Sequence, residues 1–156
     1  MKALLTAAIT TLAIASPAAA YEFDSKHQQL EHTIEHLMTV TVDDPDCFED
    51  NYAGWISREG IVICGVNSPD RADFQDTLRH EGVHLAQRCK AYVNGVTGYA
   101  VLSPTAERKG HVKFARVLQT YEPSQRSFEA EAWFIASLDA PDLVDQAIRT
   151  HCSFAF

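Results

Sequence analysis

The sequence predicts an α+β fold in which several helices pack on a small antiparallel β-sheet. Apolar residues recur at helical spacing in two stretches, residues 25–39 and 70–90. Between these stretches, two short apolar runs flank the turn at residues 58–60 and indicate a β-hairpin. Ser103-Pro104 and Pro141 have the pattern of further helix starts. Along the sequence, predicted helices therefore lie before and after one short region that forms the sheet.

Residues 1–20 have the pattern of a secretory signal peptide. One lysine precedes an apolar run, and small residues end in an A-x-A site at Ala18 to Ala20. The run is short for a membrane span of about 20 apolar residues, and no later stretch is long and apolar enough to be one. We therefore expect cleavage before Tyr21, a single domain over residues 21–156, and a secreted or periplasmic location.

Charge and cysteine content narrow the class of protein. The chain has 13 basic and 21 acidic residues and a net charge of −8, and loss of Lys2 with the signal makes it −9. An acidic surface repels phosphate backbones, so we expect no nucleic-acid partner. An even number of cysteines in an exported chain indicates two disulfides, with three connectivities open. The cysteines are Cys47, Cys64, Cys89 and Cys152, and no two of them have C-x-x-C spacing.

The first half of the exported chain is predicted to form one helix and the hairpin. The helix covers residues 25–39, behind Asp24 or Ser25 as its N-cap. The acidic, proline-containing residues 42–51 are predicted to be a loop. The two hairpin strands follow within residues 53–66.

Four helices are predicted for the second half. Their approximate ranges are residues 70–90, 103–119, 124–139 and 141–151. Each begins at a capping residue or a proline and continues with apolar residues at helical spacing. The helix over residues 70–90 comes directly after the hairpin, and the other three helices follow it.

The sequence H-E-G-V-H at residues 80–84 matches the zinc motif H-E-x-x-H. At about 100° per residue, His80 and His84 project about 40° apart, so both imidazoles can bind one ion. Glu81 projects to the side and is a poor ligand, but it can take a proton from a metal-bound water. Zinc lowers the pKa of such a water to about 7. Gly82 costs about 1 kcal/mol against alanine in a helix, which indicates close packing or a functional constraint there.

A catalytic zinc site needs a third protein ligand. Metzincin-type enzymes use a histidine six residues after the second one, and Lys90 occupies that position here. The other arrangement takes a glutamate from a later helix, where this chain has Glu129 and Glu131. Glu129 shares a face with the small residues Ala132 and Ala136, which let another helix approach, whereas Glu131 projects about 160° away. We predict Glu129 as the ligand; a solvated helix face is the alternative for both acids.

The segment HEGVH, followed downstream by EAEAW, resembles the two motifs of gluzincin metallopeptidases, in particular small members whose second motif is E-x-x-A. The resemblance implies a zincin-like fold and one Zn²⁺ per chain, bound by His80, His84 and Glu129. It also implies Glu81 as general base and a strand beside the active-site helix that receives an extended peptide, a part expected of the second hairpin strand. Larger members have an aspartate where this chain has Trp133.

Other histidines form competing arrangements. His32 and His36 belong to an inverted motif, H-x-x-E-H, but they project opposite the apolar face of their helix, so we expect a solvated surface. His111 projects onto an apolar helix face, which is typical of a core histidine, although it could also be a rival third ligand. Candidate oxyanion donors, which the sequence does not rank, are Tyr99, Tyr121 and His151.

Two functions are compatible with these patterns. The first is an exported zinc metallohydrolase, specifically a peptidase that acts on a peptide or protein substrate with Glu81 as general base. The second is a non-catalytic, disulfide-stabilised binding module with a structural or vestigial zinc site. A structural site would need a fourth protein ligand. Cys89 projects about 140° from His84 and is poorly placed for that role, which favours the open, catalytic site.

Overall fold

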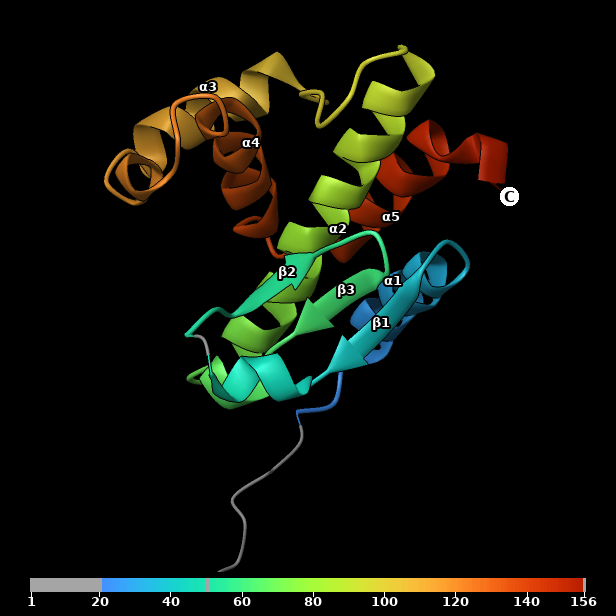
Figure 1. Cartoon of the computed structure of the whole chain (residues 1–156), viewed down its shortest axis with the longest axis vertical. Helices are drawn as coiled ribbons and strands as arrows, with labels where there is room; N and C mark the ends of the chain where they lie inside the picture. Colours follow the sequence, from blue (N-terminus) through green and yellow to red (C-terminus); the bar gives the residue numbers. More distant parts are fainter. Residues whose placement is uncertain (1–20, 50, 156) are drawn as a thin grey trace, which may run out of the picture.

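A computed structural model describes residues 21–49 and 51–155, in which helices pack against one small sheet (Figure 1). The predicted signal peptide, residues 1–20, lies outside the described residues. The helices and strands are α1 (Ser25–Glu35), β1 (Thr39–Val42), β2 (Gly54–Ile56), β3 (Gly60–Ile63), α2 (Arg71–Val93), α3 (Pro104–Lys113), α4 (Arg126–Ala136) and α5 (Pro141–His151). The α+β class is therefore confirmed. In this part of the chain, no helix combines the length and hydrophobicity that a bilayer span requires.

The sheet is mixed, with strand order β1-β3-β2. β2 and β3 form the predicted antiparallel hairpin, with Trp55 opposite Val62. β1 pairs with β3 in parallel, with Val40 opposite Ile61, so the expectation of a wholly antiparallel sheet is wrong. The first helix ends at Glu35 and leaves the next residues free to extend into β1. Parallel strands are joined by long connections, so no local turn signal marks this pairing in the sequence.

The central position in the sheet belongs to β3. Its residues Ile61 and Ile63 are fully buried, and the strand pairs with β1 on one side and β2 on the other. The backbone groups of β3 are therefore used within the sheet. The expectation that this second hairpin strand receives an extended peptide is wrong, because β1 and β2 are the edge strands of the sheet.

Helix α2 passes through the middle of the molecule and contacts the sheet, α4 and α5 (Figure 1). Its predicted apolar stripe is buried, with Phe74 and Leu78 fully inaccessible. Gly82 lies where α5 crosses, and a Cβ there would lie 2.8 Å from Val144 Cγ1. The close packing expected at this glycine is therefore contact between two helices.

Helix α3 packs on α4, and α4 packs on the flank of α2 (Figure 1). Ser103 caps α3 as predicted, since its Oγ accepts a hydrogen bond from Ala106 N at 3.3 Å. The helix ends at Lys113 rather than near residue 119, and the short 3₁₀ helix Val117–Thr120 follows. The predicted helices over residues 124–139 and 141–151 correspond to α4 and α5.

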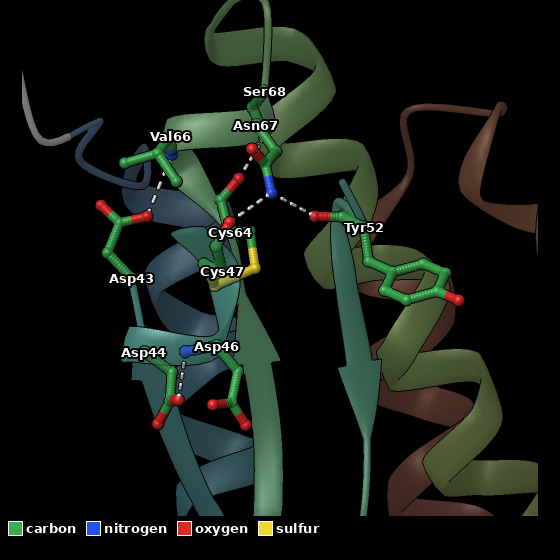
Figure 2. The surroundings of a disulfide bond; sticks show 9 residues. All are labelled: Asp43, Asp44, Asp46, Cys47, Tyr52, Cys64, Val66, Asn67 and Ser68. Carbon is green, nitrogen blue, oxygen red and sulfur yellow. Dashed lines mark hydrogen bonds between the residues drawn. A yellow bond between two sulfur atoms is a disulfide. The ribbon is translucent and has the colours of Figure 1, made fainter. Parts of the chain in front are cut away.

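Two disulfides form, and the sequence had left their pairing open. Cys89 at the end of α2 pairs with Cys152 after α5, and Cys47 pairs with Cys64. Figure 2 shows Asn67 beside the second bridge, where its Nδ2 donates to Cys47 O at 2.9 Å and Tyr52 O at 2.8 Å. These bonds fasten the segment that leads into β2. Structural disulfides of this kind are typical of an oxidising compartment.

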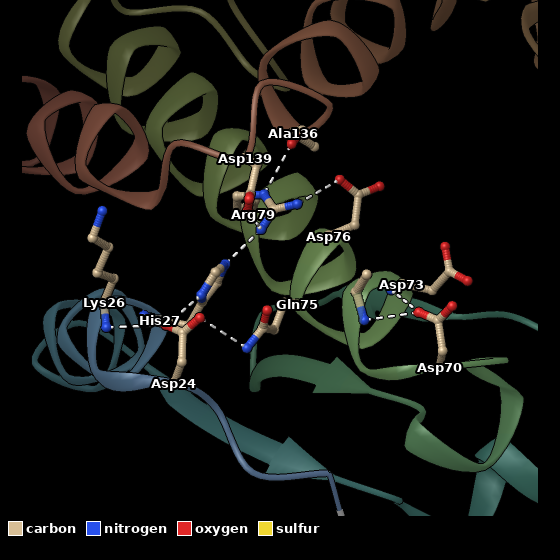
Figure 3. Close-up of polar contacts among 11 residues, drawn as sticks. Asp24, Lys26, His27, Asp70, Asp73, Gln75, Asp76, Arg79, Ala136 and Asp139 are labelled. Atoms are coloured by element: carbon tan, nitrogen blue, oxygen red, sulfur yellow. Dashed lines mark hydrogen bonds and ion pairs between the residues drawn. The ribbon is translucent and has the colours of Figure 1, made fainter.

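A buried arginine connects α1, α2 and α4. Figure 3 shows Arg79 at the centre of this network, where its Nε donates to Ala136 O, the last carbonyl of α4, at 2.9 Å. Its two Nη atoms donate to Asp139 Oδ1 at 2.9 Å and Asp76 Oδ1 at 3.1 Å. Nη1 also contacts His27 Nε2 of α1. A buried guanidinium needs such a set of acceptors, and these bonds fix the C-terminal end of α4 against α2.

Candidate metal centre

The three predicted ligands meet where α4 lies against α2. His80 Nε2 and His84 Nε2 are 3.1 Å apart, because residues four apart stack on one helix face. Glu129, in the first turn of α4, places Oε2 3.4 Å from His80 Nε2 and Oε1 3.4 Å from His84 Nε2. Tetrahedral ligands about 2.0–2.1 Å from a zinc ion are roughly 3.3–3.4 Å from one another. The group has the donors and the spacing to hold a metal ion.

The hydrogen bonding of the centre also fits a cation. Oε2 of Glu129 is buried and makes no hydrogen bond, although it faces His80 Nε2. A buried carboxylate oxygen without a partner is costly, and a cation among the three side chains would compensate it. Nδ1 of His80 is likewise buried without a hydrogen bond, and the Trp133 ring packs against this imidazole at 4.9 Å. Trp133 therefore supplies a ring contact to this histidine.

His84 has a polar partner that the sequence interpretation missed. Its Nδ1 lies 2.8 Å from Oε1 of Gln87, a fully buried residue one turn further along α2. Gln87 Nε2 in turn donates to Glu131 Oε2 at 2.8 Å. The available signal was the spacing of three residues between His84 and Gln87, which puts both on one helix face. Glu131 is fully buried and points away from the centre. It is therefore neither a metal ligand nor a solvated acid.

The charges of the centre depend on one another. Burial raises the pKa of Glu129, but its close contacts with the imidazoles of His80 and His84 outweigh burial and hold the pKa at about 2. Burial lowers the pKa of His84, yet contact with Glu129 and the charge of Glu81 outweigh it, so the net shift is upward. Burial raises the pKa of Glu81 itself, against the smaller effect of the two imidazoles. The metal-free centre therefore favours the protonated form of His84 more than an ordinary imidazole would.

The centre opens into a pocket of about 480 Å³, and Glu81 lines the same pocket. One wall is the edge strand β2, including Trp55. Four more aromatic side chains complete the walls, and these are Tyr52, Tyr99, Tyr121 and Phe128. A molecule in this pocket would contact the metal ligands, a carboxyl group and a strand edge together.

The strand edge faces the pocket with a defined hydrogen-bonding pattern. Ser57 N donates to Gly60 O, and Cys64 N donates to Ala53 O, so these positions pair with β3. In an antiparallel ladder the intervening residues turn their N–H and C=O groups to the other side. Gly54 and Ile56 of β2 are these residues. The Ile56 carbonyl accepts a hydrogen bond from Arg88 of α2 at 3.0 Å, which fastens β2 to the helix that carries the histidines.

The competing histidines lie elsewhere. His32 and His36 are exposed on α1, as expected. His111 is also exposed, with 43% of its side chain accessible, so its expected place on an apolar face is wrong. Of the three candidate oxyanion donors, Tyr99 and Tyr121 line the pocket. Burial and the charge of Glu129 raise the pKa of Tyr121, so its hydroxyl remains a hydrogen-bond donor.

Comparison of the chain with protein-family models, with curated proteins and with solved structures found no match. The class of protein is therefore defined by its own fold and site. It is an α+β protein with two disulfides and a His80-His84-Glu129 group able to bind a metal ion at the base of a pocket.

Proposed function

We propose that this protein is an exported zinc-dependent metallohydrolase that cleaves peptide bonds. The observation that carries the proposal is a three-ligand centre that opens into a pocket beside Glu81. Catalytic zinc sites use three protein ligands and leave one position open, whereas structural sites have four. All four cysteines are paired in disulfides, so no thiolate is available as a fourth ligand.

The donor set supports zinc as the metal. Two imidazoles and one carboxylate suit zinc, and the distances of 3.1 Å and 3.4 Å between donor atoms are close to the edges of a tetrahedral site. When bound, zinc would polarise a substrate carbonyl and lower the pKa of water in the open position to about 7.

The side chains around the centre have separable roles in this proposal. Glu81 lines the pocket next to the ligands, where its carboxylate takes a proton from the attacking water and passes it to the leaving amine. Its buried setting raises its pKa, which makes it a stronger base than an exposed glutamate. Tyr121 is the better of the two pocket tyrosines to donate to the developing oxyanion, because the charge of Glu129 acts on its hydroxyl, whereas the Tyr99 hydroxyl is held against Arg88.

The edge strand supports a peptide substrate. An extended peptide can add to β2 through the outward-facing backbone of Gly54 and the N–H of Ile56. Such pairing would carry the peptide backbone along the pocket wall toward the metal ligands. The similarity of HEGVH and EAEAW to gluzincin motifs agrees with this substrate class.

Export is part of the same proposal. The signal-peptide pattern of residues 1–20 and the two disulfides both favour an oxidising compartment. Expression with the native leader, followed by N-terminal sequencing of the exported protein, tests it. We expect the sequence to begin at Tyr21; retention of the leader on a cytoplasmic product would contradict export.

Metal content and hydrolysis, measured on the same variants, test the catalytic proposal. We expect about one zinc per chain in protein purified without chelators, and its loss in His84→Ala and Glu129→Ala. Glu81→Gln should keep the zinc but lose about 10²- to 10⁴-fold in cleavage of a quenched peptide library. Exposed Glu122→Gln is the matched control and should change neither quantity.

Two results would overturn the proposal. One is wild-type protein that binds no zinc, and the other is Glu81→Gln protein with full zinc-dependent hydrolysis. If zinc binds but no peptide in the library is cleaved by the wild type, the non-catalytic, disulfide-stabilised binding module becomes the better description.

A further inference from the structure

We propose that Gln87 and Glu131 form a positioning pair that fixes His84 as its Nδ1–H tautomer and fastens residues 99–103, the segment that brings Tyr99 to the wall of the pocket. Both side chains are fully buried, and neither is among the three ligands. The importance of the pair for metal binding rests on the zinc site proposed above, whereas the tautomer and the fastened wall do not depend on it.

The orientation of the Gln87 amide determines the tautomer. Its Nε2 lies 3.1 Å from Phe128 O and 2.8 Å from Glu131 Oε2, and both of these atoms are acceptors. The NH₂ group must therefore face α4, which leaves Oε1 facing His84 Nδ1 at 2.8 Å. A carbonyl oxygen can only accept, so the proton resides on Nδ1. The lone pair of Nε2 is then directed at Glu129 and the metal centre.

Glu131 holds the Gln87 amide in place and is itself held by backbone. Its carboxylate accepts from Gln87 Nε2, from Leu102 N at 2.7 Å and from Ser103 N. These three donors approach the carboxylate from two directions and hold it in one orientation. Lys90, whose Nζ donates to Val101 O at 2.6 Å, adds a positive charge to the same region. A buried carboxylate is tolerated when its oxygens are bonded in this way.

The same pair controls the position of the pocket wall. The backbone N–H of Ala100 donates to the backbone carbonyl of Gln87 at 3.2 Å, and Leu102 N and Ser103 N donate to the Glu131 carboxylate. Tyr99, at the start of the segment, lines the pocket, and its ring lies 5.2 Å from the His84 ring. The Glu131 carboxylate therefore holds both the Gln87 amide that orients His84 and the backbone that follows Tyr99.

The tautomer can be measured directly in metal-free protein. Long-range ¹⁵N–¹H correlation spectra of histidine-labelled protein, recorded on the neutral form at alkaline pH, distinguish Nδ1–H from Nε2–H. We expect Nδ1–H for His84 in the wild type and its loss in Gln87→Met. Gln75→Met is the matched control, because Gln75 is a buried glutamine of the same helix with one side-chain hydrogen bond, to Asp24. It should leave His84 unchanged.

Hydrogen exchange tests the fastened wall. In Glu131→Gln we expect amide exchange at Leu102 and Ser103 to rise by about tenfold to a hundredfold, since hydrogen bonds to a charged acceptor are lost. Amides on the far side of the molecule, in α1, should exchange as in the wild type. Two results would overturn the proposal: wild-type spectra that show Nε2–H at His84, or amide exchange in Glu131→Gln that is the same as in the wild type. Neither result requires that Gln87→Met folds.

Zinc affinity separates this proposal from the one on function. We expect Gln87→Met to bind zinc about 10- to 100-fold more weakly and Gln75→Met to bind as the wild type does. Equal affinity in Gln87→Met would remove the positioning role while the zinc site remained. Wild-type protein that shows the Nδ1–H tautomer but binds no zinc would leave the pair intact and refute the metal centre.

Discussion

Gly110 sets how closely α3 approaches the helix that carries Glu129. A Cβ built at Gly110 would lie 1.8 Å from the carbonyl oxygen of Ala130. An ordinary contact between these atoms is about 3.3–3.6 Å, so Gly110→Ala requires the helices to separate by roughly 1.5 Å. Ala130 stands between Glu129 and Glu131, and the backbone that must move therefore holds both carboxylates.

The expected cost follows from two opposing effects. In an exposed helix, glycine to alanine stabilises by about 1 kcal/mol. Here the added methyl meets backbone, which no change of rotamer can relieve, and overpacking of this kind costs about 1–3 kcal/mol or more. We expect Gly110→Ala to lower the free energy of unfolding by about 2 kcal/mol and to weaken zinc binding.

Urea unfolding of the metal-free protein, with a competition titration for zinc, measures both effects. Gly82→Ala is the comparison, because its Cβ meets a side chain, Val144 Cγ1, at 2.8 Å. It should lose less stability than Gly110→Ala, and α4 should stay in place. A Gly110→Ala protein as stable as the wild type, or more stable, would refute the close approach of α3 and α4.

Three further predictions concern cross-links and protons. Replacing Cys89 and Cys152, which are 63 residues apart, by alanine should cost about 4 kcal/mol in urea unfolding, because the closed loop is long; a loss below about 1 kcal/mol would contradict this. The pKa of His84 is raised in the metal-free centre, and zinc binds a neutral imidazole, so zinc binding on the acid side of that pKa should release a proton. Calorimetry in two buffers of different ionisation enthalpy should then give different heats of binding, and identical heats would argue against this. The hydrogen bond with His27 lowers the pKa of Asp24 from 3.8 to about 2. The stability that ionised Asp24 contributes is therefore present above pH 3.8 and is lost as the pH falls toward 2. Asp24→Asn should flatten the decline of the urea midpoint between these pH values, and an unchanged decline would exclude this role.

The parts of the site encoded by local spacing could be predicted from the sequence. His80 and His84 belong to one regular helix, where a separation of four residues fixes their relative direction whatever surrounds them. Glu129 was predicted from the small residues on its helix face. Ala132 and Ala136 are indeed fully buried, as close helix contact requires.

The parts that depend on distant segments could not be predicted in this way. β1 is a strand because β3 lies beside it in parallel, and the hydrogen bonds that define it come from residues far along the chain. Glu131 is buried because the backbone of Leu102 and Ser103 supplies its donors, and a helical projection contains no information on that segment.

His111 shows how one wrong boundary misplaces a residue. Its apolar face was projected with residues beyond Lys113, on the assumption that the helix continued. The helix ends at Lys113, so those residues do not extend the face, and the imidazole points to solvent beside Glu107. The ends of helices are the hardest feature to predict from a sequence. When the place of a residue is inferred from a predicted helix end, an error in that end misplaces the residue as well.

The attachment of α4 to α2 at both ends has a consequence for metal supply. Arg79 binds the last carbonyl of α4, and Gln87 binds Phe128 near its first turn, with Glu129 between the two attachments. Small zinc domains fold only when the ion draws their ligands together. Here the ligands are assembled by the protein alone. The chain can therefore fold before it meets an ion. If the centre holds zinc as proposed above, a period of zinc scarcity would leave the protein folded, protected from proteases and ready to be loaded again.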